Sequence, residues 1–225
     1  MLTIKLAIIY ILISSVVISL SIYLEYYDKP NERTIHSIPI INTGGLIIYL
    51  FFLIVVSLGE FNHNIELIVS IGFFVCLTGF VDDRISLNPS NKILLILIPS
   101  IYLILSGISI NDLGQYEYLG NLELGKFKIP FLLMAIGLLI NATNYIDGID
   151  GLLLTFFLSC LLYYIFLIDD AKTINLLKFF VLASFLNLIL NLLPSKSKFK
   201  VFSGDSGSLF IGFFISFMTI ELYSS

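Results

Sequence analysis

The chain has 225 residues, of which 58% are hydrophobic and 12% are charged, and its mean hydropathy is +1.00. Soluble domains are about 45–50% apolar and about 25% charged, so a soluble fold of this size could not bury the excess, and the lipid bilayer is the expected solvent. The net charge of −4 argues against a nucleic-acid-binding surface, and two histidines without a CxxC motif give little support to a zinc site.

Eight apolar stretches follow one another along the chain, each near the length of roughly 17–25 residues that a membrane-spanning helix needs. The predicted spans are residues 3–24, 41–58, 65–81, 92–109, 129–145, 151–168, 174–193 and 207–223. The first run is too long for the core of a signal peptide and no cleavage motif follows it, so we count it as a span. Residues 110–128 are polar, contain several glycines and partly alternate, which favours a small β-hairpin outside the bilayer. We therefore expect one all-α polytopic membrane domain over residues 1–225.

Each span takes the chain across the bilayer, so alternate connections share a face. The connections on the first face are residues 25–40, 82–91, 146–150 and 194–206. The basic residues on or beside this face are seven: Lys29, Arg33, Arg84, Lys92, Lys196, Lys198 and Lys200. The remaining five are Lys5, Lys126, Lys128, Lys172 and Lys178. Because Lys and Arg are enriched in cytoplasmic loops, the first face is predicted to lie in the cytoplasm.

Four polar clusters fall on this predicted cytoplasmic face. They are DKPNERTIH (28–36), VDDRISLNPSNK (81–92), NATNYIDGID (141–150) and VFSGDSGS (201–208). The last three bring five aspartates to one membrane surface, namely Asp82, Asp83, Asp147, Asp150 and Asp205. Clustered carboxylates repel one another unless they are protonated or share a cation. Oxygen ligands without a Cys or His set suit Mg²⁺ or Mn²⁺, whose shell substrate phosphates can complete.

Each cluster has a plainer interpretation when it is taken alone. VDDR at 81–84 fits a solvated helix end, and DGIDG at 147–151 fits a turn. A turn alone does not require Asn141 and Asn144 to precede it on one helical face. SGDSGS at 203–208 is either a flexible loop with a serine cap or a helix start whose N–H groups face a phosphate. IHSIPIINTGG is consistent with an ordinary loop.

Taken together, the four clusters resemble the motifs of the polyprenyl-phosphate N-acetylhexosamine-phosphate transferases in order and spacing. The residues that carry the resemblance are DKPNERTIH…GG (28–45), DDRISLNPSNK (82–92), NATNYIDGIDGL (141–152) and VFSGDSGSLFIG (201–212). The N-x-x-N-x-x-D-G-x-D-G-L string is the most specific of the four. The first motif looks more like the branch that transfers N-acetylglucosamine phosphate than the phospho-MurNAc-pentapeptide branch.

The resemblance implies an enzyme of the bacterial inner membrane that transfers N-acetylhexosamine phosphate from a UDP-sugar to undecaprenyl phosphate and releases UMP. This would be the first membrane step of a cell-envelope polysaccharide such as the O-antigen of lipopolysaccharide. It implies catalytic roles for Asp82, Asp83 and Asp147, and Mg²⁺ or Mn²⁺ held by Asp150 and Asp205. The substrate contacts that it implies are Asn144, Lys92, Arg33, His36, Gly204 and Ser206. The expected partners are the two substrates and the lipid bilayer, without nucleic acid, and a homodimer is left open.

Two alternatives compete with the enzyme. Members of the family usually continue through further helices and a cytoplasmic loop with a histidine cluster, and nothing in this chain matches that loop. An inactive homologue or a non-catalytic partner is therefore the first alternative. A membrane transporter with an acidic vestibule is the second, and it predicts ionisable residues near the middle of the spans. Nearly all the aspartates are instead expected at helix ends.

Overall fold

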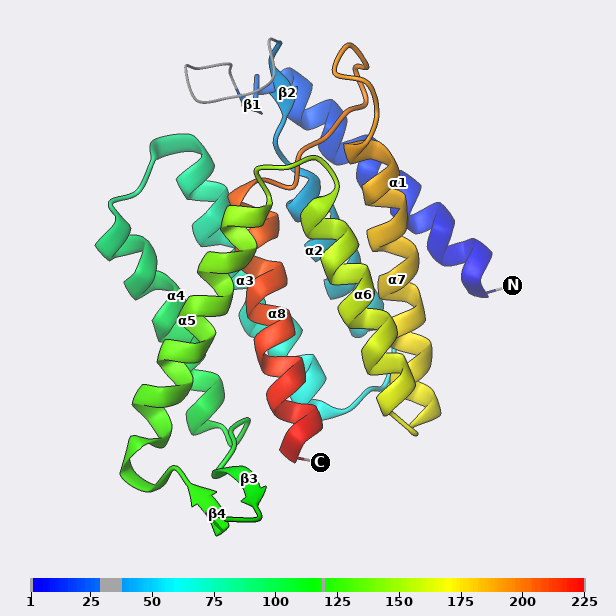
Figure 1. The fold of residues 1–225 in the computed structure, drawn as a ribbon. Helices are drawn as coiled ribbons and strands as arrows, with labels where there is room; N and C mark the ends of the chain where they lie inside the picture. Colours follow the sequence, from blue (N-terminus) through cyan, green and yellow to red (C-terminus); the bar gives the residue numbers. More distant parts are fainter. Residues whose placement is uncertain (1, 29–37, 119, 225) are drawn as a thin grey trace.

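The computed structural model describes residues 2–28, 38–118 and 120–224, and its elements follow the predicted order (Figure 1). The helices in this part of the chain are α1 Leu2–Tyr23, α2 Gly44–Leu58, α3 His63–Ile85, α4 Pro89–Leu105, α5 Lys128–Ile146, α6 Leu152–Leu167, α7 Ala171–Asn191 and α8 Gly204–Ser224. The short elements are β1 Tyr27–Asp28, β2 Ile40–Ile41, β3 Asp112–Tyr116, β4 Gly120–Glu123 and the 3₁₀ turn Gly125–Phe127. Each predicted span corresponds to one α-helix, so the all-α polytopic fold is confirmed.

Helix length separates two groups. Five helical segments of the described chain are long and apolar enough to cross a membrane, and they contain α1, α3, α5, α7 and α8. The apolar helices α2, α4 and α6 have 15, 17 and 16 residues. At about 1.5 Å per residue these three are shorter than a hydrocarbon core of about 30 Å. The chain is thus a multi-pass membrane protein with some helices that stop short of one surface.

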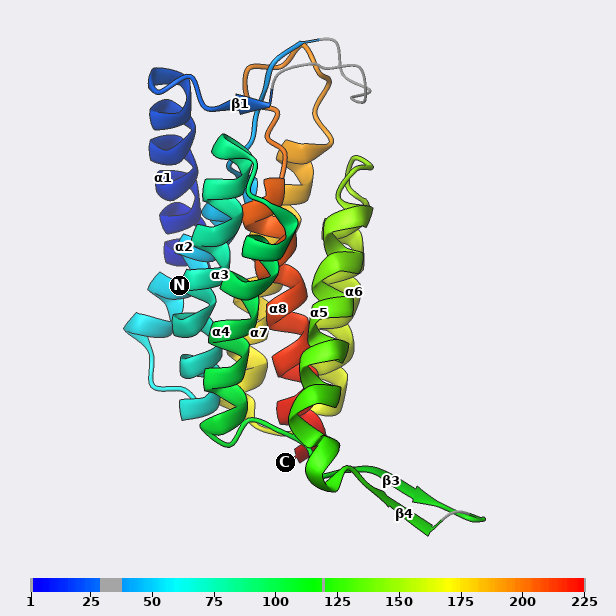
Figure 2. The same ribbon diagram turned by 90° about the vertical axis from the view of Figure 1, so that its left-hand side faces the viewer.

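Helix α8 lies in the centre of the bundle (Figures 1 and 2). It packs most extensively against α3, then against α5 and α2. Nearly every residue from Gly204 to Ile220 is buried, although the helix is also long and apolar enough to cross a membrane. A helix that is apolar all round and central needs partners on every side, and the surrounding helices supply them.

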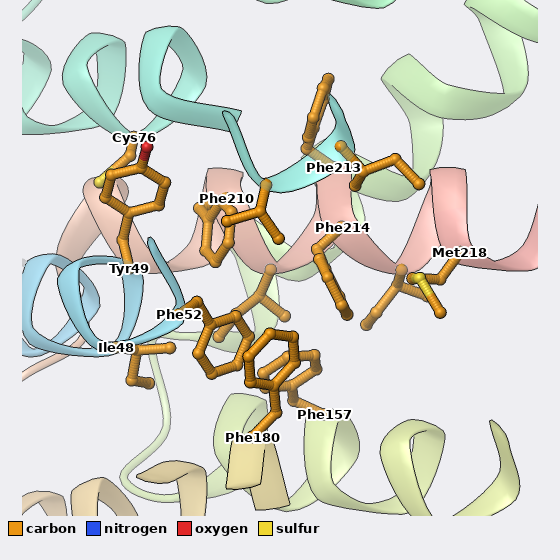
Figure 3. Close-up of a cluster of buried hydrophobic side chains, with 14 of the residues drawn as sticks. Ile48, Tyr49, Phe52, Cys76, Phe157, Phe180, Phe210, Phe213, Phe214 and Met218 are labelled. Atoms are coloured by element: carbon orange, nitrogen blue, oxygen red, sulfur yellow. The ribbon is translucent and has the colours of Figure 1, made fainter. Parts of the chain in front are cut away.

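Aromatic rings fill the middle of the bundle around α8 (Figure 3). Phe52 of α2 stacks on Phe180 of α7 with 3.5 Å between ring centroids, and Phe214 of α8 meets both rings edge-on. Phe157 of α6 and Phe210 of α8 complete the cluster. Such aromatic pairs each contribute about 0.5–1.5 kcal/mol beyond the area they bury. They fix the positions of α2, α6, α7 and α8 relative to one another.

Glycines allow α8 to approach two neighbouring helices closely at its N-terminal end. A side chain at Gly45 of α2 would overlap the backbone of Gly207, and one at Gly79 of α3 would overlap the backbone of Asp205. Small residues are the usual means of close helix contact in membranes, where helix association depends on packing. These two contacts bring the starts of α2 and α8 and the end of α3 together.

The polar connections gather at one end of the bundle. The turns α3–α4, α5–α6 and α7–α8 lie there with β1 and β2, whereas the β3–β4 hairpin lies at the opposite end (Figure 1). The predicted hairpin within residues 110–128 is thereby confirmed. Strand β2 also pairs with the chain just before α8, through the Ile41–Val201 bridge. One face of the membrane domain therefore carries the described parts of all four polar clusters.

Most helix ends differ from the predicted spans by one to four residues, and two of these differences bear on the polar clusters. Helix α3 runs on to Ile85 rather than ending at residue 81, and α8 begins at Gly204 rather than 207. Apolar runs end at the first charged residues, but these helices continue through them. Asp82 and Asp83 therefore lie in the last turn of α3, and Asp205 lies in the first turn of α8, which places them in regular helix.

Candidate active site at one end of the bundle

The first contact of the site joins the end of α3 to the start of α8. The Asp83 carboxylate accepts hydrogen bonds from the backbone N–H of Asp205 at 3.0 Å and of Ser206 at 3.4 Å. Its Oδ1 also accepts from Asn42 Nδ2 at 2.9 Å. The first N–H groups of a helix have no partner within the helix and favour an anion. Asp83 therefore caps α8 from a residue more than a hundred positions earlier in the chain.

The second contact is an ammonium group between two carboxylates. Lys92 Nζ, from the first turn of α4, lies 2.7 Å from Asp82 Oδ2 and 2.6 Å from Asp205 Oδ2. The other oxygen of Asp82 accepts a hydrogen bond from the Leu87 N–H at 2.6 Å. The lysine side chain is 18% exposed, so solvent only partly screens these charges. Lys92 thus holds the α3–α4 turn against the start of α8.

Helix α5 contributes an amide to the same cluster. Asn144 Nδ2 donates to Asp205 Oδ1 at 2.7 Å and to Ser208 Oγ at 2.8 Å. Asp205 thereby contacts α4 through one oxygen and α5 through the other. These contacts bring the motifs of α3, α5 and α8 together through Asp82, Asp83, Asn144 and Asp205.

Asp147 follows the last turn of α5 and is half-buried. Burial raises the pKa of its carboxyl well above the usual range. The charges of Asp83, Asp205 and Asp150 raise the pKa further, whereas the Ser203 hydroxyl opposes them. Asp147 is therefore suited to be protonated near neutral pH, where it could donate a proton or a hydrogen bond.

Asp150 is half exposed and lies at the edge of the cluster. Its Oδ2 is 2.5 Å from Lys200 Nζ, and the Lys200 side chain is 3% exposed. The same ammonium lies 5.3 Å from the centre of the Phe202 ring, within the range of a cation–π contact. Asp150, for which the family resemblance implies a role as a metal ligand, thus forms an ion pair with Lys200.

The donor set limits how a metal could bind. No group of three or more His, Cys, Asp or Glu side chains suited to a metal occurs among residues 2–28, 38–118 and 120–224. Asp205 and Asp150, the predicted ligands, contact Lys92 and Lys200 instead. Mg²⁺ is usually held by only one or two protein carboxylates, with water and substrate phosphates as the other ligands. The side chains therefore fit Mg²⁺ only together with a phosphate-bearing ligand.

The remaining predicted residues divide into two sets. Gly204 and Ser206 lie at the start of α8, where the Ser206 amide, predicted to face a phosphate, donates to Asp83. Gly204 has φ +67, and a side chain there would overlap Asn42 and Asp83, so the position needs glycine. Arg33 and His36 lie outside the described residues.

Sequence reasoning missed several participants because they carry no motif of their own. Asn42 stands in a stretch that fits an ordinary loop, and Asn191 ends an apolar run. Lys200 was one of three nearby lysines, and only the fold selects it as the partner of Asp150. The asparagines could have been noticed as amides placed inside or beside membrane spans, where an unpaired polar group is costly.

Comparison with known proteins gives a consistent result. The family model "Glycosyl transferase family 4" matches residues 65–223. The Bacillus subtilis (strain 168) protein named "Probable undecaprenyl-phosphate N-acetylglucosaminyl 1-phosphate transferase" is 29% identical over 223 residues, which is 96% of this chain and 61% of that protein. The "Undecaprenyl-phosphate alpha-N-acetylglucosaminyl 1-phosphate transferase" of Escherichia coli (strain K12) is 29% identical over 86% of this chain and 54% of its own length. The Yersinia pestis protein of that name is 30% identical over 83% of this chain and 52% of its own. The chain thus spans about half to three fifths of these relatives.

Proposed function

The chain belongs to glycosyl transferase family 4, and from this membership we propose that it transfers N-acetylhexosamine phosphate from a UDP-sugar to undecaprenyl phosphate. The observation that carries the proposal is the meeting of Asp83, Lys92 and Asp205 at the start of α8. These residues come from two of the motifs that resemble the transferases, and Asn144 adds a third. The names of the relatives support undecaprenyl phosphate as the acceptor and N-acetylglucosamine as the sugar.

The proposed reaction exchanges one bond at phosphorus. An oxygen of the lipid phosphate forms a bond to the phosphorus that carries the sugar. The bond from that phosphorus to the bridging oxygen breaks, and UMP leaves with its electron pair. A phosphate monoester has its second pKa at about 6, so the attacking group is already largely ionised at neutral pH and a strong base is not required. Positioning and neutralisation of charge then supply most of the catalysis.

The described side chains suit these two tasks. Lys92 would bind phosphate oxygens of the incoming lipid, since its partly exposed ammonium lies between Asp82 and Asp205 at the end of the bundle that carries the polar clusters. Asn144 would orient the diphosphate through its amide, and the protonated carboxyl of Asp147 would donate a hydrogen bond to the same ligand. Arg33 and His36 are proposed as further phosphate contacts. Asp83 holds the start of α8 against α3, which keeps Asp205 in place.

Charge balance favours a divalent cation. Of the five carboxyl groups in the cluster, Asp147 is the protonated one, and the other four face two ammonium groups, Lys92 and Lys200, among the described side chains. Two anionic substrates would add to the excess of negative charge. We propose Mg²⁺ as the cofactor, held by Asp205 and Asp150 with water and substrate phosphates. When bound, the ion supplies Lewis acidity and a template for the phosphates.

The test is an assay of UMP release by the full chain in membranes. We expect release from UDP-N-acetylglucosamine that requires undecaprenyl phosphate and stops with EDTA. Asn144→Ala should lower the rate, whereas Asp170→Ala, at the opposite end of the bundle, should not. No release from well-folded protein would contradict the proposal and favour the inactive homologue. Uptake of a solute without UMP release would favour the transporter.

The cytoplasmic position of the site is tested separately. We expect a cysteine at Ser86 to be labelled by an impermeant reagent from the cytoplasmic side, and a cysteine at Gln115 in the hairpin from the other side. Both positions are exposed and lie at opposite ends of the bundle (Figure 1). The reverse pattern would place the acidic cluster outside the cell.

A further inference from the structure

Helix α7 carries two buried asparagines on one face, close to the acidic cluster. Asn187 is 0% exposed and Asn191 is 4% exposed. They are four residues apart, so their side chains lie one above the other. A buried amide in a membrane domain is costly unless its hydrogen bonds are made. The bonds that these two amides make are therefore informative.

Asn191 joins two of the segments that form the site. Its Oδ1 accepts the N–H of Gly151 at 2.6 Å, and its Nδ2 donates to the carbonyl of Val201 at 3.1 Å. Gly151 directly follows Asp150, and Val201 lies in the segment that leads to Asp205. One side chain therefore satisfies a donor at the start of α6 and an acceptor in the α7–α8 connection.

Asn187 extends this link to α2. Its Nδ2 donates to the carbonyl of Gly44, the first residue of α2, at 2.9 Å, whereas its Oδ1 has no hydrogen-bond partner in the described part of the chain. The N–H of Gly44 donates in turn to the carbonyl of Phe202 at 2.8 Å. A side chain at Gly44 would approach both Asn187 and Phe202 too closely, which shows how tightly these segments meet. Helix α7, the start of α2 and the segment before α8 thus form one hydrogen-bonded unit.

The two asparagines therefore act on the geometry of the site through backbone groups of the segments that form it. Catalysis by positioning is sensitive to small displacements, and a shift of about 1 Å can cost about 100-fold in rate. We propose that both asparagines are positioning residues for the transfer reaction: Asn191 holds the segments bearing Asp150 and Asp205 at a fixed separation, and Asn187 holds the second segment through the start of α2. This inference rests on the proposed function, but its structural part can be tested without activity.

The structural test measures a distance between the two segments. Spin labels are placed at Ile149 and Lys198, which are both exposed, in the full chain with its two native cysteines replaced. We expect a narrow distance distribution that broadens with Asn191→Leu. The matched control is Asn175→Leu, an exposed position on the same helix, which should leave the distribution narrow. An unchanged distribution with Asn191→Leu would overturn the proposal.

A second variant covers the case in which Asn191→Leu does not fold. Asn191→Asp has nearly the same shape and keeps an acceptor for the Gly151 N–H, but its carboxylate no longer donates to the Val201 carbonyl. We expect this variant to fold and to broaden the same distribution. A distribution identical to that of the unsubstituted chain would again overturn the proposal.

The kinetic test separates positioning from binding. Asn191→Leu and Asn187→Leu should each lower kcat by about 10- to 100-fold with little change in KM for the UDP-sugar. A rise in KM at constant kcat would overturn the positioning role and favour direct binding of substrate. If the unsubstituted chain releases no UMP, the proposed function fails, whereas the distance measurement still decides whether the asparagines hold the two segments together.

Discussion

The contact between Asp83 and the start of α8 makes the clearest prediction about stability. Asp83→Ala removes a cap that accepts from the Asp205 and Ser206 N–H groups and also removes the partner of Asn42. Loss of a helix cap costs about 0.5–2 kcal/mol. A half-buried amide left without its acceptor costs about 1–3 kcal/mol. We therefore expect the free energy of unfolding to fall by about 1.5–5 kcal/mol, less any gain from removing a partly buried charge.

The assay is thermal unfolding in detergent, followed with a dye that becomes fluorescent on reaction with thiols. Cys76 is 1% exposed and reports the opening of α3. A background with Cys160→Ala removes the second thiol. Asp170→Ala is the matched control, because Asp170 caps α7 at the opposite end of the bundle by accepting from Thr173. It should lower stability without changing the rate of UMP release per folded molecule.

The variants Asp83→Ala and Asp83→Asn separate a structural role of Asp83 from a catalytic one. Asp83→Asn keeps one acceptor oxygen, and we expect it to retain more stability than Asp83→Ala. If Asp83→Ala unfolded at the temperature of the unsubstituted chain but had no activity, the cap would contribute nothing and the carboxylate would act on substrate. That result would refute the assignment of Asp83 as the residue that holds α8.

Three further predictions concern charge and packing. Lys92→Gln leaves two partly buried carboxylates without their cation. The free energy of unfolding in detergent should therefore fall by an amount between about 1 kcal/mol, the value for an exposed ion pair, and about 3–5 kcal/mol, the value for a buried one. Gly45→Ala forces a methyl group into the Gly207 backbone and should cost at least about 1–3 kcal/mol, whereas Gly137→Ala faces open space and should gain about 0.5–1 kcal/mol. The raised pKa of Asp147 means that its ionisation opposes folding, so stability is lost as pH rises toward the folded-state pKa. Asp147→Asn should therefore unfold at a higher temperature than the unsubstituted chain near neutral pH and lose this advantage at about pH 4. The same difference in unfolding temperature between the two proteins at both pH values would contradict the prediction.

The positions of the helices could be predicted because each apolar run is long and is interrupted by charge or glycine. Helix ends could not, since they depend on distant partners. The apolar count ends at Val81, but α3 continues because its last turn is held by the contacts of Asp82 and Asp83. In the same way α8 begins three residues early because Asp83 supplies an acceptor for its first N–H groups.

Only those residues of the site that belong to a sequence motif could be predicted. The aspartates and Asn144 stand in recognisable strings, and parity placed those strings on one face. The ion pairs were not predictable, because nothing in the sequence distinguishes Lys200 from Lys196 or Lys198 as the partner of Asp150. Asn191 was hidden for the same reason, since its two partners are backbone groups, and backbone groups leave no sequence pattern.

These contacts also constrain how substrate can bind. The N–H groups at the start of α8 already donate to Asp83, and Lys92 already contacts two carboxylates. A phosphate that binds here must replace some of these contacts, so its free energy of binding is only the difference between the contacts it makes and those it replaces. Exchange of the cap would require α8 to move, because the Asp83 carboxylate is also held by a hydrogen bond from Asn42. Lys92 is more readily redirected, because its long side chain is flexible and partly exposed and because a cation beside Asp205 would weaken its present ion pair. The backbone framework would then stay fixed while the lysines change partners, so that charge is rearranged at the site without movement of the helices that build it.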